Sequence, residues 1–117
     1  METPMETEKK ALALLGLAAR AGRVTVGLPL TCEALKNARN EKRPQLVLLA
    51  SDASANTVKR ITDRTNYYKV SLCRLQAAGH TLALAVGKRE TDVAVVGVTE
   101  PHLAAAVREL LTAEKQI

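Results

Sequence analysis

Apolar residues recur along the chain with two periods, and together they predict helices and strands in strict alternation. Continuous apolar runs favour strands that are covered on both faces, over residues 46–50 and 93–98. Alternation of Val70 and Leu72 with polar residues predicts another strand over residues 70–74, and Val24–Val26 is expected as a short edge strand. Helical spacing favours five helices, over residues 9–22, 27–40 and 81–86, after residue 54 and from residue 101. We therefore expect an α/β fold with helices on both faces of a mainly parallel or mixed sheet.

Residues that commonly cap helices stand at the ends of these segments. Gly22 suits the C-terminal end of the first helix. Asp52 and Ser54 offer caps for the third helix, and the Thr99-Glu100-Pro101 run is typical of a helix start. The local chemistry thus agrees with the hydrophobic pattern.

The predicted second helix has an unusual surface. Pro29 suits its first turn, where a missing N–H costs nothing. Leu30 and Glu33 fall on the face opposite the apolar stripe, so a leucine is expected in solvent near the positive end of the helix. The stripe expected to face the core consists of Leu28, Cys32, Leu35 and Ala38.

Composition and charge narrow the classes of partner. The 117 residues suffice for one domain, which we place at residues 9–117 after a disordered segment at 1–8. The net charge is +5 and the pI is near 9.5, yet residues 1–8 contain glutamates and no base. A basic domain of this kind favours a polyanionic partner, although a merely basic surface explains the same charge.

Several classes of function find no support in the sequence. The polar, acidic N-terminus is not typical of a signal peptide, and no apolar run predicts a membrane helix. Cys32 and Cys73 lie in apolar surroundings, and His80 and His102 lack a ligand spacing, so we expect neither a disulfide nor a metal site. We expect a cytoplasmic, non-enzymatic monomer that needs no cofactor.

Nucleic acid is the polyanion that these residues favour, in one mode of binding. Tyr67 and Tyr68 are the only aromatic residues, too few for the stacking platforms that unpaired strands require. Recognition of a folded duplex or bend through its backbone and shape remains. The start of the second helix suits phosphate, and Gly27 would let a nucleic-acid backbone come close.

Three stretches of the chain resemble one known family. They are "AGRVTVG", "PQLVLLASDAS" and "VGKRETDVAVVGVT", and the likeness extends over residues 9–111. They resemble the ribosomal-protein L7Ae/L30e superfamily, and most of all the small L7Ae-type proteins of Gram-positive bacteria. The resemblance implies a single-domain three-layer α/β/α sandwich with a mixed four-stranded sheet, and binding of structured RNA, typically a kink-turn.

The resemblance also implies where RNA would bind. In the family, a Gly-x-Asn-Glu-x-x-Lys run opens the second helix and reads sheared G·A pairs and nearby phosphates. The family glycine corresponds to Gly27, the Asn-Glu pair to Pro29 and Leu30, and the lysine to Glu33. Proline and leucine cannot make the base-edge hydrogen bonds of Asn and Glu, and Glu33 would repel phosphate. We therefore expect binding to depend on charge more than on sequence, with Lys36 replacing some of the lost charge.

A second contact is implied after the fourth helix, where the family has a loop that closes over a flipped-out nucleotide. This loop corresponds to Lys88, Arg89, Glu90 and Thr91, directly after Gly87. Together the two segments predict a protein of the translation apparatus or ribosome that binds kink-turn-like or other folded RNA. The alternative is a protein-interaction module that kept the fold, because Leu28, Pro29 and Leu30 form a small apolar knob.

Overall fold

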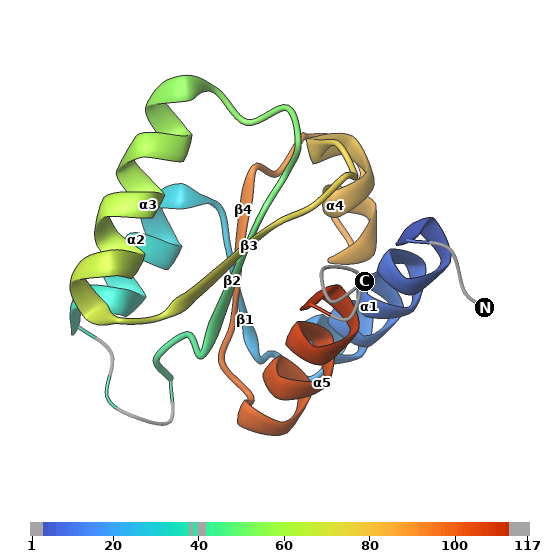
Figure 1. The fold of residues 1–117 in the computed structure, drawn as a ribbon, viewed down its shortest axis with the longest axis horizontal. Helices are drawn as coiled ribbons and strands as arrows, with labels where there is room; N and C mark the ends of the chain where they lie inside the picture. The colour runs from blue at the N-terminus through green and yellow to red at the C-terminus, as the bar shows by residue number, and fades with distance from the viewer. Residues whose placement is uncertain (1–3, 38, 40–41, 113–117) are drawn as a thin grey trace.

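A computed structural model describes residues 4–37, 39 and 42–112, and within them helices and strands alternate as predicted (Figure 1). The helices are α1 (Pro4–Arg20), α2 (Leu28–Asn37), α3 (Ala55–Tyr68), α4 (Gly79–Ala85) and α5 (Pro101–Thr112). The strands are β1 (Val24–Val26), β2 (Leu46–Leu49), β3 (Ser71–Arg74) and β4 (Val95–Val98).

The four strands form one mixed sheet in the order β1-β4-β2-β3. β4 is antiparallel to both of its neighbours, whereas β2 and β3 run parallel. β1 is an edge strand, as predicted, and its partners on β4 run from Val24 opposite Val98 to Val26 opposite Val96. The chain therefore enters α2 directly from the edge of the sheet.

The central strands are apolar throughout because helices cover both of their faces. On β2, Leu46 and Leu48 belong to the core cluster formed with α1, α4 and α5, whereas Val47 and Leu49 belong to the cluster formed with α2 and α3. Figure 1 shows the same division, with α2 and α3 on one side of the sheet and the other three helices opposite. The three-layer α/β/α sandwich is confirmed.

The first helix begins earlier than the sequence predicts. Residues 1–8 are expected to be disordered, but α1 begins at Pro4, and residues 1–3 lie outside the described part of the chain. The side chain of Glu8 is buried, and its two carboxylate oxygens accept hydrogen bonds from the N–H groups of Gln76 (2.7 Å) and Ala77 (3.0 Å). Burial and these charge-assisted bonds account for the ordered turn.

Two further expectations need correction at the helix ends. Asp52 caps α4 rather than α3, because its carboxylate accepts from the N–H of Gly79 at 2.8 Å, and α4 consequently begins at Gly79 instead of Thr81. Ser54 caps α3 as expected, accepting from the N–H of Thr57. The predicted second helix reached Asn40, but Ala38 and Asn40 lie outside the described residues.

Cys32 and Cys73 are not joined in a disulfide. Cys32 on α2 is partly buried against the core cluster between α2, α3 and the sheet, in agreement with its predicted position. Cys73 lies on β3 and packs against the opposite cluster. The sheet therefore separates the two thiols.

Gly97 allows an unusually close approach in the middle of the sheet. A Cβ at this position would lie 2.5 Å from Thr25 Oγ1 and 3.0 Å from Pro44 Cγ, and neither contact can be accommodated without movement. Thr25 belongs to β1 and Pro44 to the segment that leads into β2. The missing side chain thus lets the edge strand β1 and the segment that leads into β2 both pack closely against β4.

We predict that Gly97→Ala destabilises the protein by about 1–3 kcal/mol, the usual cost of overpacking a core. Urea denaturation followed by circular dichroism measures the change. In a Thr25→Ala background the cost should shrink, because the closest atom has been removed. An equal cost in both backgrounds would contradict this origin of the strain.

Candidate nucleic-acid interface

The turn between β1 and α2 depends on Gly27. Its φ of +95° lies in the region that favours glycine, its N–H donates to Val95 O at 2.8 Å, and its carbonyl accepts from Thr31 N at 3.1 Å. The Gly27 amide therefore points into the sheet, and Pro29 has no N–H. Helix geometry leaves the amides of Leu28 and Leu30 as the first-turn donors for an external acceptor.

A pair of threonines fixes the same turn from inside. Thr31 is fully buried, and its hydroxyl lies 2.9 Å from that of Thr25 on the neighbouring strand. The predicted core stripe of α2 did not include Thr31, whereas the structure buries Thr31 and Leu35 most deeply. The hydrogen bond explains the difference, because it satisfies a hydroxyl that would otherwise be costly to bury.

A groove of about 570 Å³ runs between the edge strand β1 and α2. It brings together three residues that the sequence singled out from two distant segments, namely Leu30, Glu33 and Lys88. The Leu30 side chain is 62% exposed at its margin. The groove is lined by Val24, Thr25, Val26, Leu30, Glu33, Ala34, Asn37, Lys42 and Lys88.

The charge of Glu33 is engaged within its own helix. Its Oε1 accepts a hydrogen bond from the Nδ2 of Asn37, one turn further along α2. Lys36 is exposed on the last turn of α2 but does not line the groove, and the exposed Pro29 does not line it either. Leu28 packs against the core between α2 and α3. Only part of the implied helix motif therefore faces the groove.

The end of α4 positions the loop that contains Lys88. Lys88 N donates to Ala83 O at 2.8 Å and Gly87 N to Leu84 O at 3.1 Å, with Gly87 at φ +82°, which together form a Schellman cap. Lys88 reaches the groove directly from this cap. The following residues are exposed and do not line the groove: Arg89, Glu90 and Thr91.

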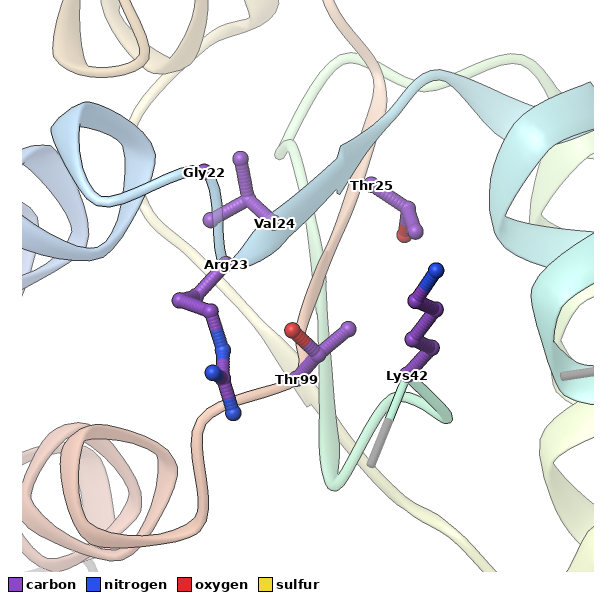
Figure 2. A pocket seen from close by; sticks show the side chains of 6 residues that line it. All are labelled: Gly22, Arg23, Val24, Thr25, Lys42 and Thr99. Atoms are coloured by element: carbon purple, nitrogen blue, oxygen red, sulfur yellow. The ribbon is translucent and has the colours of Figure 1, made fainter. Parts of the chain in front are cut away.

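A second hollow of about 390 Å³ continues from the groove around the start of β1 (Figure 2). It is lined by Gly22, Arg23, Val24, Thr25, Lys42 and Thr99. Val24, Thr25 and Lys42 also line the groove beside α2. Sequence reasoning named Thr99 only as part of a helix start and did not single out Arg23 or Lys42, because the sequence signal for them was no more than the positive net charge.

The carboxylate of Glu100, next to Thr99, caps the N-terminal end of α5. A hydrogen bond from the N–H of Leu103 at 2.6 Å holds the pKa of Glu100 below its ordinary value of 4.5, and the charges of His102 and Arg23 act in the same direction. Because the folded state prefers the ionised form, this stabilisation is present well above pH 4.5. It is lost as the pH falls through the lowered pKa of the folded state.

We predict that Glu100→Gln destabilises the protein at neutral pH and that the difference from the parent protein disappears as the pH falls below the lowered pKa of Glu100. Thermal unfolding across a pH series measures it. Glu109→Gln, at an exposed position on the same helix, is the matched control. A difference for Glu100→Gln that persisted unchanged at the acidic end would contradict the role of its charge.

Two other kinds of site are absent from the described part of the chain. No three His, Cys, Asp or Glu side chains within it gather closely enough to hold a metal ion. None of its helices has the length and apolar character needed to cross a membrane.

Comparisons with known proteins agree on one family. Residues 9–107 match the family described as "Ribosomal protein L7Ae/L30e/S12e/Gadd45 family". The chain is 43% identical over 98 residues to the RNA-binding protein YlxQ of Bacillus subtilis, covering 84% of this chain and 91% of that protein. It is 35% identical over 103 residues to the protein of the same name from Enterococcus faecium, covering 88% and 92%.

Solved structures give the same fold. A protein of unknown function from Bacillus halodurans superposes with a TM-score of 0.77 at 30% identity, covering 87% of this chain and 96% of that one. The 15.5kD RNA binding protein of Giardia lamblia superposes with a TM-score of 0.75 at 16% identity, covering 94% and 88%. At that identity, the second likeness concerns the fold alone.

Proposed function

Since the chain belongs to the ribosomal protein L7Ae/L30e/S12e/Gadd45 family, we propose that it binds structured RNA and carries out no chemical reaction. The names of its relatives in B. subtilis and E. faecium support RNA as the partner. We further propose that it acts as a cytoplasmic monomer associated with the ribosome or with translation.

The groove beside α2 is the observation that carries this proposal. Lys88 and Lys42 line it, the first turn of α2 with its outward amides lies beside it, and Glu33 is held by Asn37. Phosphate groups are stabilised both by such cations and by the positive end of a helix. A folded RNA that presents its backbone to this groove would meet these charges without needing an aromatic platform.

The residues at the start of α2 give little support for the reading of base edges. Pro29 offers no side-chain donor or acceptor, and Leu30 presents an apolar surface where an amide or carboxylate would be needed to read base edges. We therefore propose recognition of shape and backbone, of a kink-turn-like or another folded RNA, with affinity that depends mainly on charge.

The double substitution Lys88→Ala with Arg89→Ala should weaken binding to all structured RNAs alike. It should also reduce the slope of affinity against salt by up to about two units, since each phosphate contact contributes about 0.9. Binding titrations over a salt series, on a kink-turn and on a plain duplex, measure both effects. Lys59→Ala with Arg60→Ala removes the same charge from an exposed face of α3 and is the matched control. Equal losses for the two double variants would contradict a role for the loop.

The substitution Leu30→Glu with Glu33→Lys should raise the preference for a kink-turn over a duplex. It restores an acceptor for base amino groups and a cation for phosphate, and by analogy with DNA a bidentate base contact contributes about 1–3 kcal/mol of discrimination. The same titrations measure the ratio of the two affinities. A parent protein that already bound the kink-turn far more tightly than the duplex would overturn our interpretation of Pro29, Leu30 and Glu33.

The exposed Leu30 favours a second candidate function, that of a protein-interaction module. With Pro29 it forms an apolar knob at the start of α2. An apolar contact would depend weakly on salt, whereas RNA binding weakens steeply as salt rises. The salt series therefore separates the two functions.

A further inference from the structure

We propose that the hollow between Arg23, Lys42 and Thr99 is a second phosphate-binding site, which takes the sugar–phosphate backbone of an RNA that also occupies the groove beside α2. This inference rests on the proposed function and extends it to the start of β1. Arg23 directly precedes this strand and α2 follows it, while Lys88 lines the groove beside the strand.

Arg23 and Thr99 are held side by side by the backbone. Arg23 follows the Schellman cap at Gly22, where Arg23 N donates to Ala18 O at 2.9 Å. Its carbonyl accepts from Thr99 N, also at 2.9 Å, where β4 ends. The two side chains therefore enter the hollow from fixed neighbouring positions.

Lys42 approaches from the opposite side. Pro44 packs against Gly97, and Gln45 N donates to Val98 O at 2.7 Å, so the segment that carries Lys42 crosses the end of β4. Figure 2 shows Arg23 and Lys42 on either side of Thr99, with the Lys42 ammonium directed toward Thr25. Three connections of the fold thus place two cations around one concave surface.

The guanidinium of Arg23 has an unsatisfied donor. Its Nε is buried and has no hydrogen-bond partner among the described residues. A buried polar group without a partner is costly, and more so when it carries a charge. A phosphate oxygen in the hollow would accept from this N–H, and guanidinium suits phosphate because it presents several donors in a planar fork.

The local charge favours an anion. Among the residues that the structure describes, no acidic side chain lines the hollow. The charge of Arg23 helps to lower the pKa of the nearby Glu100, whose carboxylate accepts a hydrogen bond from Leu103 N and caps α5. Glu100 offsets part of the positive potential, while the lining itself remains cationic through Arg23 and Lys42.

Continuity with the groove identifies the occupant as an RNA backbone rather than a free phosphate ion. Val24, Thr25 and Lys42 line both hollows, so one strand can pass along the edge of β1 from Lys88 to Arg23. A free ion would fill one position and gain nothing from this connection. A polyanion gains from every cation along the path.

The experiment compares two double variants. The test variant carries Arg23→Gln and Lys42→Gln. The control variant carries Lys59→Gln and Arg60→Gln, which remove the same charge from an exposed face of α3. Affinity for a stem-containing RNA is titrated from 50 to 200 mM salt. For the test variant, the fall in affinity over this range should shrink about tenfold, the value expected when two phosphate contacts are lost. Lys42→Gln alone should show about half of this decrease in salt dependence on a logarithmic scale. Because Lys42 is exposed in a loop, we expect this variant to fold as the parent protein does.

Phosphate-ethylation interference locates the contact. Some phosphates, when ethylated, should weaken RNA binding by the parent protein but not by the Arg23/Lys42 variant. These phosphates should differ from the ones whose ethylation no longer matters in the double variant Lys88→Gln with Arg89→Gln. A titration with inorganic phosphate alone distinguishes the free ion. Saturation by inorganic phosphate without any change in RNA binding for the variant would overturn the assignment to RNA.

The outcomes separate this inference from the proposed function. If the parent protein binds RNA and the Arg23/Lys42 variant behaves as the α3 control does, the second site is wrong while RNA binding stands. If the two interference patterns coincide, the second site is likewise wrong. If the parent protein binds no structured RNA at any salt concentration, the proposed function fails, and this site fails with it.

Discussion

The absence of a side chain at Gly97 lets both Thr25 and Pro44 pack closely against the middle of β4, and the arrangement of the edge formed by β1 and α2 depends on this close packing. Thr25 brings the short strand β1 against the sheet and, through its hydroxyl, holds Thr31 and the first turn of α2. Pro44 fixes the segment that carries Lys42. A three-residue strand has few ladder hydrogen bonds, so close packing supplies much of what keeps it in register.

The fold could be predicted largely from the sequence because each covered strand, such as Leu46–Leu49, is apolar on both faces, and such strands alternate with helical spacing. The start of α1 could not. The order at Glu8 depends on the N–H groups of Gln76 and Ala77, which lie far away in the sequence. Asp52 was assigned to the wrong helix for the same reason, since local spacing cannot reveal an acceptor shared between two loops.

The candidate site likewise contains some residues that could be predicted from the sequence and others that could not. Helical spacing predicted that Leu30 would be exposed, and the resemblance of the sequence to the L7Ae/L30e superfamily drew attention to Lys88. Arg23, Lys42 and Thr99 belong to three connections with no common motif. They meet because β4 lies next to β1 in the sheet, and strand order is a property of the whole fold rather than of any segment.

The distribution of charge along the edge of β1 supports the proposal that this surface binds RNA without reading bases. Lys88 and Lys42 line the groove beside α2, together with Leu30 and a Glu33 that is engaged with Asn37, and Arg23 joins Lys42 in the second hollow. Under the proposed function, an RNA whose backbone follows this edge would gain from contacting several of these cations at once. Leu30 makes no hydrogen bond that would demand a particular base. Selectivity would then arise from the shape of the RNA backbone. A rigid sheet edge holds its cations at fixed positions and so favours one arrangement of phosphates, whereas a flexible basic tail does not.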